Sequence, residues 1–152
     1  DHNTLNVSEK EFVDLINAFH VSKDFENLPL MEEESVEIIN ELSRRYNIIA
    51  ITAVGTNPFI AIRRRNILEK YFPDVFDEVH CTRYGAKKTH ILSRYPSSIW
   101  IEDNVRNAKD GFDLGHTPIL YANNYNKEDR FEGLHIANNW EEIHDIINNI
   151  DM

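Results

Sequence analysis

Short apolar runs separated by helix-length segments are the feature that most limits how this chain can fold. A strand buried on both faces reads as a continuous apolar run. Strands that alternate with helices of about ten residues are typical of a parallel sheet. The pattern therefore predicts one doubly wound α/β domain over residues 1–152. The runs lie at Ile48–Ala53, Val75–Cys81, Ser98–Ile101, Thr117–Tyr121 and Leu134–Ala137, with helices predicted over 58–71, 87–95 and 105–114 between them.

The two ends of the chain carry helix-start signals. Ser8 to Glu11 form a capping box, and the apolar residues that follow it recur at helical spacing, which predicts a helix there. Residues 20–32 are expected to form a loop, and a second helix is predicted to follow it. A terminal helix is predicted from Trp140, capped by Asn138 or Asn139. The apolar residues after the capping box are Phe12, Leu15, Ile16 and Phe19.

Composition excludes several classes of protein. A net charge of −10 argues against non-specific nucleic-acid binding as the main activity, but it allows a local basic patch. No apolar stretch approaches the roughly 18 residues of a membrane span. Cys81 is the only cysteine, so no internal disulfide can form, and we expect a cytoplasmic protein. The run Arg63–Arg65 is expected to form a solvated helix face.

Two adjacent acids follow the run Ile99–Ile101. Acids at the carboxyl end of a buried strand lie at the rim of the sheet, where open α/β sheets bind their ligands. Glu102 and Asp103 would repel each other unless a positive group lies between them, and a divalent metal with oxygen ligands is the usual solution. The acidic pair therefore predicts a metal site at this edge.

Four segments follow one another along the chain: Asp1–Leu5, Ile49–Ala53, Lys87–Leu92 and Ile99–Asn104. Together they resemble the motifs of the haloacid dehalogenase (HAD) superfamily of phosphatases, and they are most similar to its 5′-nucleotidase and deoxyribonucleotidase branch. The resemblance implies a HAD-like fold with a minimal cap at residues 6–30. It also implies a phosphoric monoester hydrolase that acts through an aspartyl-phosphate with Mg²⁺.

The resemblance also assigns roles to single residues. It implies that Thr52, through its hydroxyl, Ala53, through its amide, and Lys88 bind the phosphate, and that Thr52 and Lys88 act in catalysis. Lys87 is an alternative to Lys88. Asp103, beside Glu102, is implied to hold the Mg²⁺ together with Asp1, which would also be the nucleophile.

The first motif departs from the family pattern Asp-x-Asp-x-Thr. With Asp1 as the nucleophile, Asn3 takes the place of the second acid. Anchoring on Asn3, Thr4 and Leu5 instead puts His2 there and the nucleophile before Asp1, and a third register makes Asp1 the second acid. No register completes the motif. The apolar strand that should precede it is also missing, so we expect that strand upstream of residue 1.

Two functions remain open. The first is a Mg²⁺-dependent phosphatase that acts on nucleotides or on a phosphorylated nucleic-acid end, since a small cap favours a bulky substrate. The alternative is a catalytically inactive module of the same fold that binds a protein or nucleic-acid partner. A flavodoxin-like or receiver-type domain explains neither Thr52 nor the Glu102–Asp103 pair as well. The Asn- and Ile-rich composition resembles that of phage proteins.

Overall fold

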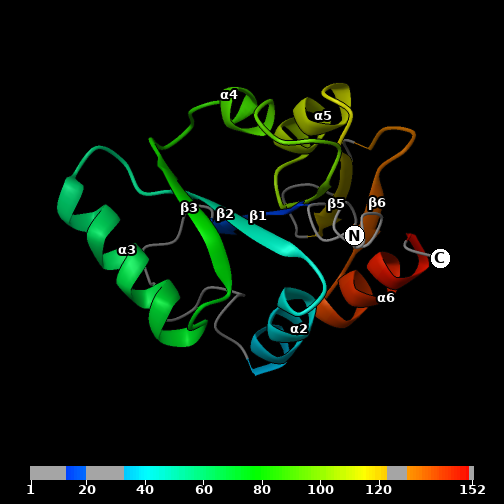
Figure 1. Ribbon diagram of the computed structural model, residues 1–152. Helices are drawn as coiled ribbons and strands as arrows, with labels where there is room; N and C mark the ends of the chain where they lie inside the picture. Colours follow the sequence, from blue (N-terminus) through cyan, green and yellow to red (C-terminus); the bar gives the residue numbers. More distant parts are fainter. Residues whose placement is uncertain (1–12, 20–32, 123–129, 151–152) are drawn as a thin grey trace.

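The computed structural model describes residues 13–19, 33–122 and 130–150, in which six parallel strands lie between two layers of helices (Figure 1). The strand order is β3-β2-β1-β4-β5-β6, so the predicted doubly wound α/β fold is confirmed. The strands are β1 (Val13–Phe19), β2 (Asn47–Ala53), β3 (Phe76–Thr82), β4 (Ile99–Glu102), β5 (Thr117–Tyr121) and β6 (His135–Ala137).

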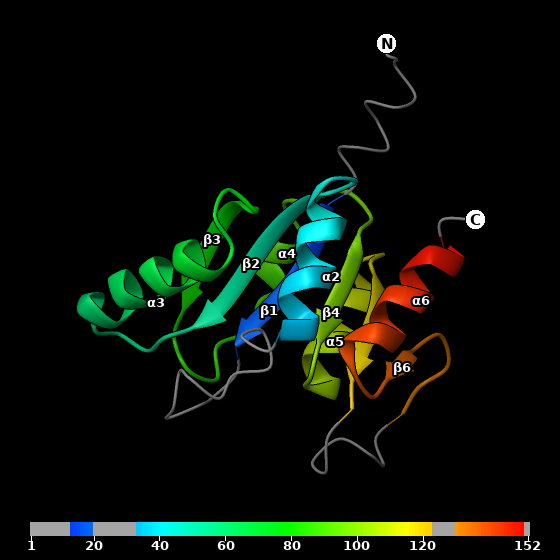
Figure 2. The same cartoon turned by 90° about the horizontal axis from the view of Figure 1, so that it is seen from below.

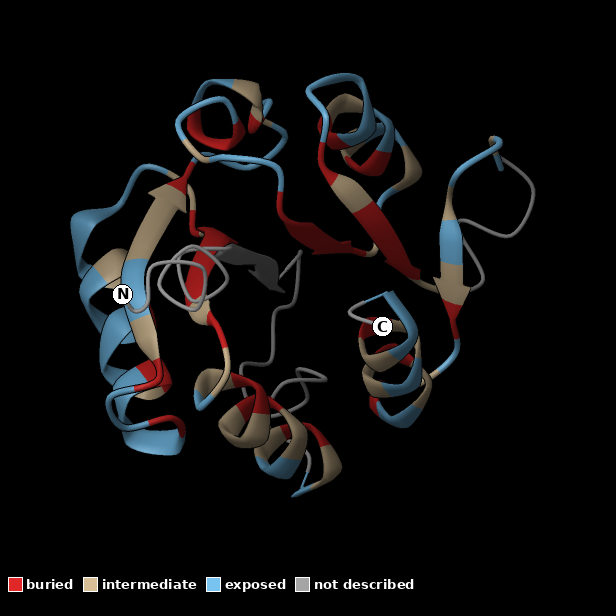
Figure 3. Ribbon diagram, turned by 45° about the vertical axis from the view of Figure 1, so that its right-hand side comes forward, coloured by how far each residue is buried: buried red, intermediate tan, exposed pale blue. Residues whose placement is uncertain are grey.

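Helices cover both faces of the sheet. Figure 2 shows α2 (Glu33–Ser43) and α6 (Trp140–Ile150) in front of the strands, and α3 (Pro58–Tyr71) packs beyond them toward the β3 edge. The short α4 (Thr89–Leu92) and α5 (Val105–Asp113) cover the opposite face. Each face has its own apolar core, and β2 and β4 between them are buried (Figure 3).

The amino-terminal prediction is wrong in this structure. Residues 13–19 form the central strand β1, which pairs with β2 and β4, instead of a helix after the capping box. The apolar residues of this segment fit a helical period, and periodicity alone does not separate a helix from a strand in so short a segment. The sequence analysis expected the first strand of the sheet to lie upstream of residue 1. In the structure, β1 occupies the central position between β2 and β4. The rest of the predicted cap, and the capping box itself, lie outside the described residues.

The remaining predicted elements are confirmed with small shifts. α4 is shorter than predicted. Asn139 caps the terminal helix, since its side-chain oxygen accepts a hydrogen bond from the Glu142 amide at 2.8 Å. Among the described residues, no helix is both long enough and apolar enough to span a bilayer.

α5 packs unusually closely on β4. A Cβ atom at Gly111 would lie 2.4 Å from Cδ1 of Trp100, so only glycine permits this approach. The Trp100 indole donates a hydrogen bond to the Asn107 carbonyl at 3.0 Å. The Asn104 side chain accepts from the Asn107 amide and caps α5. These contacts hold the β4–α5 turn, which contains the two predicted site acids.

Candidate functional site

The carboxyl ends of the parallel strands place the predicted site residues at one edge of the sheet. Thr52 and Ala53 end β2, Glu102 ends β4, and β1 lies between these two strands. Lys88 comes just before α4, on the same side of the sheet edge. The structure therefore brings these residues to the same edge of the sheet, as the sequence predicted. The roles of these residues in phosphate and metal binding remain predictions.

Lys88 and Glu102 form a buried ion pair. The Lys88 ammonium lies 3.2 Å from the Glu102 carboxylate, and their side chains are 5% and 0% exposed. The ammonium also lies 5.6 Å from the centre of the Trp100 ring. Lys87 is exposed. The structure therefore favours Lys88 over Lys87 as the lysine of this edge.

Glu102 is held by the turn that follows it. Its second carboxylate oxygen accepts hydrogen bonds from the backbone amides of Asp103, at 2.9 Å, and Asn104, at 3.1 Å. Burial raises the pKa of Glu102 to about 7; Lys88 lowers it, and the neighbouring Asp103 carboxyl raises it. Glu102 is thus a structural anchor for the turn, and Asp103, which is only half-buried, is the acid closer to solvent.

Thr52 has a partner that the sequence analysis missed. Its hydroxyl accepts a hydrogen bond from the guanidinium of Arg64 on α3, and both residues are buried. Burial lowers the pKa of Arg64 to about 10. Arg64 shares a helix face with Ile60 and Leu68, at i−4 and i+4, and this spacing was the signal in the sequence. Of the three arginines expected on a solvated face, Arg64 is buried and its two neighbours are exposed.

Thr52 and Glu102 lie on opposite faces of the sheet. Ile48 and Ala50 of β2 pack with α2 and α3, and Thr52 continues that face because side chains alternate along a strand. Trp100 packs with α4, and Glu102 continues that other face. The two predicted groups therefore share an edge but do not converge from one face.

The described residues of the central strand place no acid at this edge. The carboxyl end of β1 consists of Asn17, Ala18 and Phe19, and Phe19 pairs with Thr52. Asp14 lies nearer the other end of the strand, opposite Ile99. Asp1, the predicted nucleophile and metal ligand, lies outside the described residues.

The acids at this edge do not by themselves complete a Mg²⁺ site. Mg²⁺ requires several oxygen ligands in near-octahedral geometry. Both oxygens of Glu102 already accept hydrogen bonds, from Lys88 and from two amides, and the carboxyl of the half-buried Asp103 also interacts with Glu102. Throughout residues 13–19, 33–122 and 130–150, no group of three or more His, Cys, Asp or Glu side chains could hold a metal ion.

A pocket of about 560 Å³ opens beside this edge. It lies between the β2–α3 and β3–α4 connections and is lined by residues 54–57, Ile60, Arg83 and Tyr84. Asn57 caps α3 here, since its side-chain oxygen accepts from the Phe59 amide at 2.9 Å. The sequence analysis did not identify this pocket, because its lining comes from two connections that only the fold brings together.

Comparison with known proteins supports the fold. YfnB of Bacillus subtilis, a protein assigned to the HAD hydrolases and crystallised with bound magnesium, aligns with a TM-score of 0.54 and 14% identity, over 77% of this chain and 56% of its own. An uncharacterized 32.4 kDa protein from the Gp30-rIII intergenic region of Enterobacteria phage T4 is 24% identical over 120 residues.

That alignment covers 76% of this chain and 43% of the phage protein, so the chain spans less than half the length of this relative. No protein-family model matches the sequence. The α/β fold of this chain therefore matches that of YfnB over most of the chain's length.

Proposed function

We propose that this chain is a HAD-type hydrolase of phosphate monoesters. The observation that carries the proposal is the buried Lys88–Glu102 pair at the carboxyl edge of the sheet, directly beside Asp103. A lysine held at this edge can neutralise charge that develops on a phosphoryl group, and the low dielectric around it strengthens that interaction.

The proposal assigns separate tasks to the chain's own residues. Lys88 stabilises the negative charge of the bound phosphate, and Glu102 fixes the position of its ammonium. Ala53 offers its backbone at the edge, and Thr52 is fixed there by Arg64.

Asp103 is proposed to contribute one ligand to Mg²⁺, which would neutralise charge between the phosphate and the attacking carboxylate. Asp1 is proposed as the second ligand and as the nucleophile. The substrates we propose are nucleotides or phosphorylated nucleic-acid ends.

The test is release of inorganic phosphate by the full-length protein in Mg²⁺. Substrates are p-nitrophenyl phosphate, nucleoside monophosphates and a 3′-phosphorylated oligonucleotide. We expect Mg²⁺-dependent turnover that Asp103→Asn abolishes and that Lys88→Ala lowers by about 10²–10³, the effect of losing one charge-stabilising donor. Because Lys88 is buried, circular dichroism must show that its variant folds; the half-buried Asp103 provides the test if it does not.

Lys87→Ala is the matched control, since this neighbouring lysine is exposed. We expect its rate to equal that of the unmodified protein. A damaging Lys87→Ala together with a silent, folded Lys88→Ala would overturn the assignment of the lysine. An absence of turnover on all substrates would overturn the hydrolase proposal.

One observation favours a second candidate function. The described end of β1 offers Asn17, Ala18 and Phe19 at the position where a nucleophilic aspartate is expected. A domain without that aspartate would bind a phosphorylated ligand or a protein partner without hydrolysing it. Saturable binding of a nucleoside monophosphate without turnover, lost in the folded Lys88→Ala variant, would support this second candidate.

A further inference from the structure

Positive charge is concentrated beside the proposed site, although the chain as a whole is acidic. The net charge is −10, yet residues 54–68 and 79–101 contain no Asp or Glu. These two segments include the β2–α3 and β3–α4 connections, which meet at the carboxyl edge of the sheet. Their cations are Arg63, Arg64, Arg65, Arg83, Lys87, Lys88 and Arg94.

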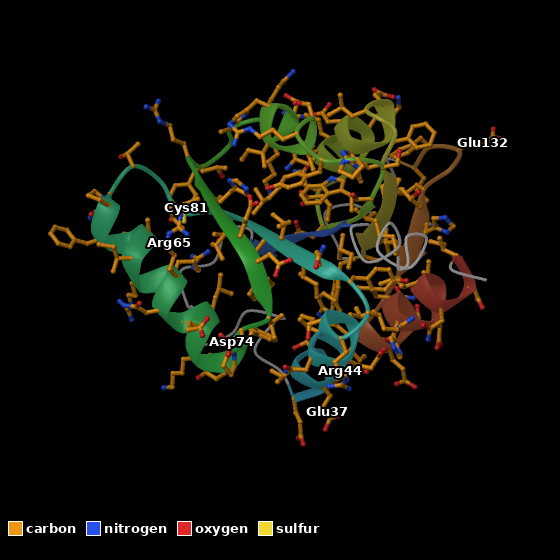
Figure 4. The ribbon with its side chains drawn as sticks, viewed as in Figure 1. Glu37, Arg44, Arg65, Asp74, Cys81 and Glu132 are labelled. Atoms are coloured by element: carbon orange, nitrogen blue, oxygen red, sulfur yellow. The ribbon has the colours of Figure 1, made fainter. Side chains whose placement is uncertain are left out.

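Exposed aromatic residues lie among these cations. Phe59 is 77% exposed and Tyr84 is 57% exposed. Arg63, Arg65 and Arg83 are also exposed. We call these five residues the basic aromatic surface. Figure 4 shows Arg65 on the part of α3 nearer to Cys81, and Asp74 beyond the other end of the helix.

The surface is held in place by close packing. A Cβ atom at Gly55 would lie 2.9 Å from the Tyr84 ring, so that ring lies directly against the β2–α3 connection. Arg83 and Tyr84 form one wall of the pocket, and Asn57 and Ile60 at the start of α3 form the other. One cation and one aromatic ring of this surface, Arg83 and Tyr84, therefore line a formed cavity that the start of α3 closes on the other side.

We propose that the basic aromatic surface binds single-stranded nucleic acid and directs its phosphorylated end toward the edge that holds Lys88. Arginines contact backbone phosphates, and exposed aromatic rings stack with unpaired bases. An acidic protein segment would use the cations but would not need the two exposed rings. This inference rests on the proposed function, of which it specifies the substrate class.

The test is fluorescence anisotropy of a labelled, 3′-phosphorylated dT12 oligonucleotide with the full-length protein in EDTA, where turnover does not interfere. We expect Arg65→Glu combined with Arg83→Glu to weaken binding at least tenfold in 50 mM NaCl. The double variant should also lower the slope of log K against log salt by about 1.4, at about 0.7 per lost phosphate contact. Tyr84→Ala should weaken binding on the order of tenfold through lost stacking.

Matched controls lie at the other end of α3. Lys70→Glu changes the net charge as much as Arg65→Glu does, and Tyr71→Ala removes another exposed ring, 39% exposed. Neither should change the affinity. The proposal would be overturned by equal losses in Lys70→Glu and Arg65→Glu, by a silent Tyr84→Ala, or by poly-glutamate competing as well as unlabelled dT12. Binding is measured without turnover, so the two proposals can fail separately. A protein that binds dT12 but hydrolyses no substrate overturns the hydrolase proposal alone. A protein that hydrolyses its substrates but does not bind dT12 overturns the nucleic-acid proposal.

Discussion

Replacing Lys88 with methionine tests whether the Lys88–Glu102 pair acts through its charge. The two groups lie 3.2 Å apart and are almost fully buried, and breaking a buried pair leaves its partner's charge uncompensated. Methionine keeps most of the side-chain volume, so the packing against Trp100 changes little. The effect should therefore depend on whether Glu102 is ionised.

The direction in which stability changes with pH follows from the pKa of Glu102, which burial raises from an ordinary value of 4.5 to about 7 in the folded protein. The folded state then holds a proton that the unfolded state releases between these two values, so the contribution of Glu102 to stability falls as pH rises from 4.5 to about 7. Above about pH 7, the contribution of Glu102 to stability no longer changes with pH. Without Lys88 the folded pKa rises further, and the fall continues to higher pH.

The magnitude follows from that further rise. One opposite charge at hydrogen-bonding distance shifts a carboxyl pKa by about 1–3, and each unit corresponds to about 1.4 kcal/mol. We therefore expect Lys88→Met to lose about 1–2 kcal/mol more at pH 8.5 than at pH 6, measured by urea unfolding in EDTA. Lys87→Met, on an exposed neighbour, should show no such difference. An equal loss at both pH values would show that Lys88 acts through packing and would refute the argument.

Two further predictions concern the scaffold of the site. Gly111→Ala should destabilise the fold by about 1–3 kcal/mol, because its Cβ would meet the Trp100 ring at 2.4 Å; an unchanged melting temperature would contradict the packing of α5 on β4. The buried His116 ring accepts a hydrogen bond from the Ser98 amide at 3.1 Å, and burial lowers its pKa below 6.5. The fold should therefore lose stability as pH falls below about 6.5, because His116 takes up a proton more readily in the unfolded chain than in the folded protein. An NMR titration midpoint of His116 at or above 6.5 in the folded protein would refute this prediction.

The sequence predicted the parts of the fold that have strong local signals. The runs that become β2 and β4 are continuous and apolar, and polar residues mark where each one ends. Because the carboxyl ends of parallel strands meet at one edge, the positions of Thr52 and Asp103 at the ends of their strands predicted that they share it, and the family resemblance added Lys88. The Asn139 cap of the terminal helix likewise follows from a short-range rule.

The features that the sequence did not predict depend on tertiary contacts. Phe12, Leu15, Ile16 and Phe19 satisfy a helical period, and only pairing with two neighbouring strands makes residues 13–19 a strand. The role of Arg64 depends on α3 packing over the end of β2, which brings its guanidinium to Thr52. In a run of three arginines, charge alone does not show which one faces the sheet.

The position of β1 has a consequence for how the chain folds. β1 comes first among the described strands, yet Asp14 pairs with Ile48 on one side and with Ile99 on the other. During synthesis, β2 can join β1 early, but the second edge of β1 stays open until residues near Ile99 leave the ribosome. An unpaired strand edge can pair with other chains and aggregate. Completion of β4 is therefore the step that covers the second edge of β1, before β5 and β6 extend the sheet.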